Sequence, residues 1–281
     1  MLSPESVILS HGREGNMRRL VDLIGTGRSD HVARPAIPEG LAVFAVGDVH
    51  GCVDLLVEMH REIIKQAKAL PENLKRVVVY LGDYIDRGPD SADVIDLLVA
   101  APLPGFKSIH LLGNHEHAFI RFVRGERDFL NSPKVVQWLF REGGLATLKS
   151  YGVTVSSNTF PENIQRMRVQ LLRKMPTDHF EFLQRLTLNH SIGDYFFVHA
   201  GIDPTRSLSE QRPSDLLNIR EPFLASKELY DKVIVHGHTP YKAPNIQSNR
   251  IGLDTEAEAS GRLSGLLLQR DNLKLLQVKH T

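Results

Sequence analysis

The chain has 281 residues, of which 42% are hydrophobic and 24% charged, and its formal net charge is +1. This composition excludes a wholly disordered or collagen-like chain, and the charge balance gives no reason to expect a nucleic acid or an anionic membrane as partner. The single cysteine, Cys52, excludes an intramolecular disulfide framework. One cysteine is typical of a reducing compartment, so we expect a cytoplasmic protein.

Residues 1–38 are expected to form an N-terminal extension. They mix glycine, arginine and aspartate and end in the breaker-rich segment RPAIPEG at 34–40. A short helix is predicted near residues 17–24. The first residues lack a basic segment followed by an apolar one, so no secretory signal is expected. The longest apolar runs are far shorter than the roughly 20 residues of a membrane helix.

From residue 41 onward the sequence alternates between strand and helix patterns. Apolar runs at 41–46, 77–81 and 106–112 predict strands, and apolar residues at helical spacing predict helices over 53–70 and 91–100. Another helix is expected to begin near His115. This alternation predicts βαβ units and a mostly parallel sheet.

Residues 118–183 are predicted to form a charged helical insertion, with helices at 135–140, 145–151, 164–172 and 178–183. Because segments placed over a rigid sheet usually carry recognition, we expect the insertion to contribute specificity. Its arginines could meet an acidic partner, although a solvated helix face is the simpler interpretation.

The last third of the chain is rich in strand patterns. Two hairpins are predicted, one from 186–190 and 195–199 and the other from 263–268 and 273–278. A β-rich half that follows an α/β half predicts two sheets packed on each other.

Six polar residues follow five apolar strand patterns, the last of which is at 233–235: Asp48 and His50, Asp83, Asn114, His199, and His238. In open α/β sheets, ligands bind at the carboxyl ends of the strands. If the five strands share a sheet end, these side chains converge. Each short motif alone is usually a turn, but five of them with metal-binding residue types predict a site.

The donor set contains carboxylates, an amide and imidazoles but no thiolate. Such donors suit manganese, iron or zinc. Six ligands are too many for one tetrahedral ion, but they fit two adjacent ions that share a bridging carboxylate. Two such ions clamp the attacking and leaving oxygens of a phosphoryl transfer.

Five sequence blocks carry a family resemblance: GDVHG (47–51), GDYIDRG (82–88), GNHE (113–116), HAG (199–201) and GHT (237–239). They resemble the signature blocks of the metallophosphoesterases and, more narrowly, the bacterial branch of the phosphoprotein phosphatases, which are serine/threonine protein phosphatases. The resemblance implies an α/β fold with two packed mixed β-sheets flanked by helices, the α/β/β/α sandwich of calcineurin-like enzymes. It also implies that residues 39–281 are the catalytic domain.

The resemblance implies a dinuclear metal site, with manganese expected and iron or zinc as alternatives. One ion would be held by Asp48 and His50, both ions by Asp83, and the second ion by Asn114, His199 and His238. His236 is expected to pack beside the site rather than bind metal.

The resemblance also implies the remaining catalytic roles. Arg87, Arg220 and Asn114 would bind the substrate phosphate, and His115, oriented by Asp86, would be the general acid. The implied mechanism is direct in-line attack of metal-bound hydroxide on phosphorus. Cys52 is expected to pack rather than act as a nucleophile.

The substrate class is open between two alternatives. A serine/threonine protein phosphatase acting on a phosphorylated protein or peptide is the first choice, because the sister group that hydrolyses diadenosine tetraphosphate typically carries glutamine where this chain has His50. Diadenosine tetraphosphate or another nucleotide polyphosphate is the alternative. In favour of it, Cys52 follows the first sequence block, as a cysteine does in that sister group. A non-catalytic metal-binding scaffold is a third reading. Glu256 replaces a glycine of the family pattern and could affect anionic substrates.

Overall fold

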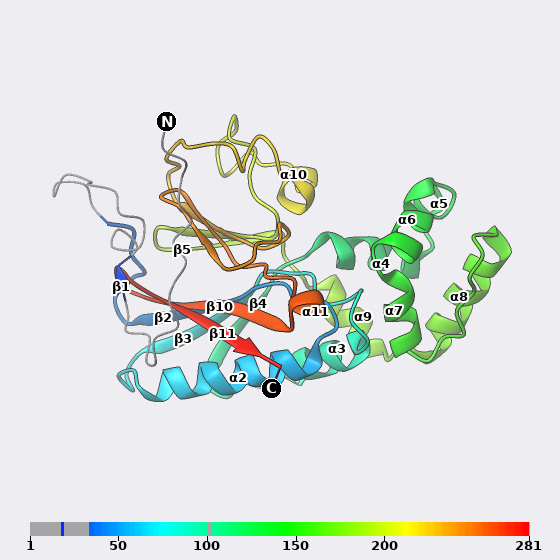
Figure 1. Cartoon of the computed structure of the whole chain (residues 1–281), viewed down its shortest axis with the longest axis horizontal. Coiled ribbons are helices and arrows are strands. Elements are labelled where there is room, and N and C mark those ends of the chain that lie inside the picture. Colours follow the sequence, from blue (N-terminus) through cyan, green and yellow to red (C-terminus); the bar gives the residue numbers. More distant parts are fainter. Residues whose placement is uncertain (1–17, 20–33, 101–102, 281) are drawn as a thin grey trace.

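Two β-sheets packed face to face, with helices on their outer sides, form the body of the molecule in this computed structural model (Figure 1). The structure describes residues 18–19, 34–100 and 103–280. One sheet has six strands in the order β1-β11-β10-β2-β3-β4, and the other has five in the order β5-β6-β7-β9-β8. Both sheets mix parallel and antiparallel pairs, so the predicted fold class is confirmed.

The first sheet is built around three parallel strands, β2 (Leu41–Val46), β3 (Lys75–Tyr80) and β4 (Phe106–His110). They are joined by the crossover helices α2 (Val53–Lys68) and α3 (Ser91–Val99), as the alternating pattern predicted. Helices on one face and the second sheet on the other bury both faces of β2. Its side chains therefore form a continuous apolar run, as is typical of parallel strands.

The C-terminal hairpin, β10 (Arg262–Gln269) and β11 (Asn272–Lys279), belongs to the first sheet. The sequence predicted this hairpin and two packed sheets, and the structure has both, with the hairpin joined to the α/β strands and not to the other C-terminal strands. Strand β10 runs antiparallel to β2, with Leu266 opposite Ala45. The pairing covers an edge of β2 that would otherwise present unpaired backbone groups.

The second sheet contains five short strands: β5 (Asn189–Ile192), β6 (Tyr195–Val198), β7 (Val233–His236), β8 (Asn245–Ile246) and β9 (Arg250–Gly252). The predicted hairpin of β5 and β6 is present. Apolar side chains from the two sheets pack between them; Val43 and Val79 of the first sheet belong to the same buried cluster as Phe197 and Val235 of the second.

The helical insertion extends from one end of the sandwich (Figure 1). It contains α4 (Asn114–Arg124), α5 (Arg127–Leu130), α6 (Pro133–Arg141), α7 (Gly144–Ser150), α8 (Pro161–Lys174) and α9 (Thr177–Gln184). Its Trp138 and Leu148 share one hydrophobic cluster with Leu56 of α2 and Ile95 of α3. The insertion therefore shares the core of the domain.

Two of the arginines in the insertion have internal partners. Arg121 forms ion pairs with Glu126 and Asp128. Arg168 donates hydrogen bonds to two backbone carbonyls of α4. These two arginines therefore stabilise the insertion itself, which is neither contact with an acidic partner nor a simple solvated helix face.

The remaining elements are β1 (Arg18–Arg19), α10 (Pro213–Asn218) and α11 (Ala257–Ser260). Strand β1 pairs with β11, so the helix predicted near residues 17–24 does not include residues 18–19. The rest of that predicted helix lies outside the described residues. No helix within the described ranges is long and apolar enough to cross a membrane.

Candidate metal centre

The loops that follow the strands adopt backbone conformations that are rare for residues with a side chain. Seven described non-glycine residues have positive φ, and five of them are predicted site residues: His50, Asp83, Asp86, Arg87 and His238. Left-handed backbone costs free energy in such residues, and it concentrates where the surrounding structure enforces it at functional sites.

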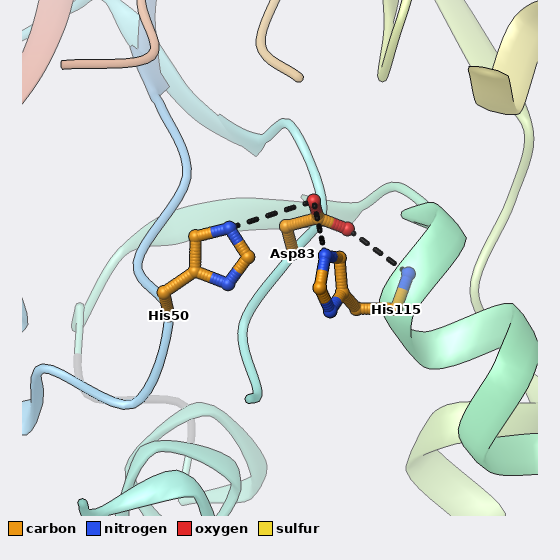
Figure 2. Close-up of side chains that lie close together, drawn as sticks. All are labelled: His50, Asp83 and His115. Carbon is orange, nitrogen blue, oxygen red and sulfur yellow. Dashed lines mark hydrogen bonds and ion pairs between the residues drawn. The ribbon is translucent and has the colours of Figure 1, made fainter. Parts of the chain in front are cut away.

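The carboxylate of Asp83 is the centre of the site. Its Oδ2 lies 3.7 Å from Nε2 of His50, 3.8 Å from Nε2 of His115 and 3.3 Å from Nε2 of His199. Figure 2 shows His50, on the loop after β2, and His115, in the first turn of α4, pointing toward Asp83. Two potential metal-binding groups share this carboxylate, His50–Asp83–His115 and Asp83–His199–His238. Asp83 is thus the residue common to both groups.

Backbone carbonyls orient two of the imidazoles. Nδ1 of His50 lies 2.9 Å from the carbonyl oxygen of Ile85, and Nδ1 of His199 lies 2.9 Å from that of Leu81. A hydrogen bond from Nδ1–H leaves the lone pair on Nε2, which faces Asp83. Metal-binding histidines are commonly oriented in this way.

Asp48, Asn114 and His238 complete the donor set. Oδ2 of Asp48 accepts a hydrogen bond from the backbone N–H of His238 at 2.8 Å, and Oδ1 of Asn114 lies 2.9 Å from ring nitrogens of both His199 and His238. Within the described part of the chain, Oδ1 of Asp48 and Nε2 of His238 are buried without a hydrogen-bond partner. Buried unpartnered polar atoms are costly, and cations would satisfy them. The donor set therefore fits two divalent ions.

The two aspartates respond differently to their surroundings. Burial and the neighbouring Asp254 raise the pKa of Asp48 well above its usual value. Asp83 is also buried, but His199 and His115 outweigh burial and lower its pKa well below the usual value. The ionised form of Asp48 is thus the less favoured of the two, and a bound cation would stabilise it.

The backbone at position 237 lies so close to the side chain of Asp48 that only glycine fits there. A Cβ added to Gly237 would lie 1.9 Å from Oδ1 of Asp48. No side chain fits there, so glycine beside His238 is a steric requirement of the site.

His115 and Asp86 form a buried hydrogen-bonded pair. Nδ1 of His115 lies 2.7 Å from Oδ2 of Asp86, and the backbone N–H of His115 donates to Oδ1 of Asp83 (Figure 2). Burial opposes protonation of His115, but Asp83 and the hydrogen bond to Asp86 raise its pKa to about 9. The imidazole can therefore carry a proton on Nε2, the ring nitrogen that faces the site.

The insertion fixes Asp86, a role that the sequence analysis missed. Nε1 of Trp138 in α6 donates to Oδ2 of Asp86 at 2.7 Å, and the hydroxyl of Thr147 in α7 donates to Oδ1. The Thr147 hydroxyl also accepts the backbone N–H of Asp86 at 2.9 Å. These residues lie 52 and 61 positions from Asp86, so no local pattern indicates the contacts.

Glu116 is a second residue whose role was missed. Its buried carboxylate accepts backbone N–H groups of Asp83 and Tyr84 at 2.8 Å and of Gly113 at 3.0 Å. Burial and nearby Asp83 raise the pKa of Glu116 to about 7. The only sequence feature that could have indicated this role was the position of Glu116 at the end of the GNHE block.

Both predicted phosphate-binding arginines lie beside the centre. Nη1 of Arg87 lies 3.3 Å from a carboxylate oxygen of Glu258, and Nη2 of Arg220 donates to the carbonyl oxygen of His238 at 3.2 Å. The loop that carries His238 thus brings Arg220 close to the donor set.

The other residues singled out from the sequence take structural positions. Cys52 is buried, and burial raises the pKa of its thiol to about 12, which fits the expected packing role. His236 is buried against Phe223 and Tyr241. Glu256 is exposed and has φ of +52°. A left-handed backbone is a physical reason for the glycine of the family pattern at this position.

Comparisons with known proteins agree on the fold. The calcineurin-like phosphoesterase family matches residues 41–275. The chain is 26% identical over 242 residues to bis(5'-nucleosyl)-tetraphosphatase PrpE [asymmetrical] of Bacillus velezensis, covering 80% of this chain and 88% of the relative. The same enzyme of Bacillus subtilis is 26% identical over 239 residues, covering 80% and 90%.

Solved structures share the architecture. A candidate diadenosine tetraphosphatase superposes with a TM-score of 0.59 at 20% identity, covering 89% of this chain and 99% of that one. A serine/threonine phosphatase from Saccharomyces cerevisiae with similarity to human phosphatase PP5 gives a TM-score of 0.51 at 15% identity, covering 86% and 81%. At these identities the likeness shows the fold alone.

Asp83→Asn should weaken metal binding by at least about 10- to 100-fold, the loss expected even for partners outside the ligand set. The amide cannot supply the shared negative charge. Manganese titration calorimetry measures the affinity and stoichiometry. Asp128→Asn, at an exposed side chain in α5, is the control. Unchanged manganese binding in Asp83→Asn would contradict the bridging assignment.

Glu116→Gln should destabilise the fold by about 2–3 kcal/mol, because the amide nitrogen cannot accept the backbone N–H groups that a carboxylate oxygen accepts. Urea denaturation measures the change. Glu181→Gln, at an exposed position of α9, should change stability by less than about 0.5 kcal/mol. A similarly small effect of Glu116→Gln would show that Glu116 does not hold the Asp83 turn.

Thr147→Val should lower turnover of p-nitrophenyl phosphate by about 10- to 100-fold, because Asp86 loses a donor and small displacements at an acid–base pair are costly. Thr147→Ser keeps the hydroxyl and is the matched control. Steady-state kinetics with manganese present measures both variants. Equal turnover of the valine and serine variants would exclude a positioning role for the hydroxyl.

Proposed function

Since the chain belongs to the calcineurin-like phosphoesterase family, we propose that it is a metal-dependent hydrolase of nucleotide polyphosphates, with dinucleoside tetraphosphates as its substrate class. The observation that carries this proposal is the name shared by the curated relatives, bis(5'-nucleosyl)-tetraphosphatase, over about four fifths of the chain. It favours the alternative of the sequence analysis over a serine/threonine protein phosphatase.

The donor set supports two metal positions. Asp83 would bind both ions, Asp48 and His50 would bind one of them, and the other would be held by Asn114, His199 and His238. Divalent ions, of which manganese is the expected one and iron or zinc the alternatives, supply positive charge and an activated water to phosphoryl transfer.

Arg87 and Arg220 would bind phosphate oxygens beside this centre, together with the amide of Asn114. Guanidinium groups match phosphate geometry and stay charged at all physiological pH values. The contact between Arg220 and the carbonyl oxygen of His238 supports this role, since it holds the cationic side chain next to a metal-ligand loop.

His115 would protonate the departing oxygen. The proton leaves from Nε2, while Nδ1 stays hydrogen-bonded to Asp86 and keeps the ring oriented. The contacts of Trp138 and Thr147 with Asp86 support this assignment, because they immobilise the partner of the acid. An intact acid–base pair also argues against a non-catalytic metal-binding scaffold.

A serine/threonine protein phosphatase is the second candidate, with a phosphorylated protein or peptide as substrate. The specific observation in its favour is His50, at a position where the dinucleotide-hydrolysing group typically carries glutamine. His50 is buried and hydrogen-bonded to the carbonyl oxygen of Ile85, so it is fixed facing Asp83.

A side-by-side assay with manganese separates the two candidates. Diadenosine tetraphosphate should be hydrolysed with a kcat/KM at least about tenfold above that of phosphoserine, phosphothreonine and phosphotyrosine peptides, equivalent to about 1.4 kcal/mol of transition-state discrimination. His115→Asn, as a control, should lose the activity and so assign it to this site. Preference for a phosphopeptide would overturn the proposed substrate class and favour the second candidate.

A further inference from the structure

Glu258 of the short helix α11 contacts Arg87 from outside the predicted site. The two side chains form an ion pair of 3.3 Å between Nη1 and Oε1. The Arg87 side chain is 34% exposed and that of Glu258 is 19% exposed, so the pair is partly shielded from solvent. The 171 positions that separate the two residues in sequence explain why no motif indicates the pair.

The backbone of Arg87 is already fixed by its surroundings. Its φ is +64°, and its N–H donates to the carbonyl oxygen of Gly143 at 3.4 Å. A Cβ on Gly143 would lie 2.3 Å from the Arg87 nitrogen, so the two backbones are in close contact. Only the long side chain of Arg87 then needs an additional contact to define where the guanidinium points.

Glu258 contacts the Arg87 guanidinium directly and is not one of the proposed metal ligands. Burial works against the charge of Arg87, but Glu258, followed by Asp83, Asp254 and Asp48, raises its pKa above the usual value. Asp83 and Asp48 are proposed metal ligands, whose charges bound ions would neutralise. Glu258 belongs to neither potential metal-binding group, so its attraction for Arg87 remains when the site is loaded.

We propose that Glu258 is a positioning residue that orients the Arg87 guanidinium for substrate phosphate. A guanidinium has five N–H donors in a planar fork, and one contact to Glu258 leaves the others for phosphate oxygens. Holding the side chain in the free enzyme reduces the entropy lost when substrate binds. This inference rests on the proposed role of Arg87 in binding phosphate.

An opposite effect is also physically possible, because the Glu258 carboxylate repels an anion that approaches Arg87. The geometry favours positioning, since only one nitrogen of Arg87 contacts one oxygen of Glu258. The two effects predict opposite signs when Glu258 is removed. If orientation dominates, phosphate binding weakens; if repulsion dominates, it becomes tighter.

The test measures two quantities on manganese-loaded protein: the Kd of inorganic phosphate by calorimetry, and the KM and kcat of p-nitrophenyl phosphate. Glu258→Ala should raise Kd and KM by about 2- to 10-fold and leave kcat within about twofold, the size expected for freeing one long side chain. Glu258→Gln keeps an acceptor oxygen without the charge and should recover most of the loss. Glu256→Gln, at the exposed position two residues away, controls for the loss of one nearby charge.

A double variant tests whether Glu258 changes phosphate binding through Arg87. If Glu258 acts through Arg87, the Kd of Arg87→Ala/Glu258→Ala should equal that of Arg87→Ala alone. Tighter or unchanged phosphate binding in Glu258→Ala, or an additive loss in the double variant, would overturn the inference. Wild-type phosphate affinity in Arg87→Ala would instead show that the proposed phosphate-binding role of Arg87 is wrong.

Discussion

The buried carboxylate of Asp83 is the constraint on which the site depends. It lies in a left-handed turn after β3, and imidazoles from three other segments, His50, His115 and His199, face it. Such a turn leaves backbone N–H groups without strand partners, and the carboxylate of Glu116 accepts them. The carboxylate of Asp83 thus organises the imidazoles around it, and the carboxyl group of Glu116 organises the backbone that presents Asp83. Burial of both groups is offset by the imidazoles around Asp83 and by the backbone N–H donors around Glu116.

The sequence predicted the parts of the fold that depend on short segments. Strand β2 and the motif after it could be predicted because a continuous apolar run ends at a glycine-containing turn. The pairing of β10 with β2 could not be predicted from the sequence. Strand order depends on long-range packing, and the hairpin pattern contains no information about it. The predicted ligands shared one neighbourhood for the same local reason: each follows a strand whose carboxyl end meets the others. Trp138 and Thr147, which contact Asp86, and Glu258, which contacts Arg87, come from distant segments and gave no such signal.

The helical insertion has a different role in this molecule from the one that the sequence suggested. We expected a recognition element, but Trp138 and Thr147 contact Asp86 directly, and Gly143 contacts the backbone of Arg87. The insertion also shares a hydrophobic core with α2 and α3. A change in its packing would therefore affect Asp86, the partner of His115, and the backbone of Arg87 together. Any contribution to specificity is coupled to the geometry of catalysis.

The net charge of +1 conceals a strong local imbalance at the site. Asp48, Asp83, Asp254 and Glu258 all act on Arg87, so without cations a cluster of carboxylates surrounds the guanidinium expected to bind phosphate. A polyphosphate carries several negative charges and would be repelled by that cluster. Divalent ions at Asp48 and Asp83 remove much of the repulsion and leave Glu258 paired with Arg87. In the proposed function the ions consequently favour binding of the substrate as well as its cleavage.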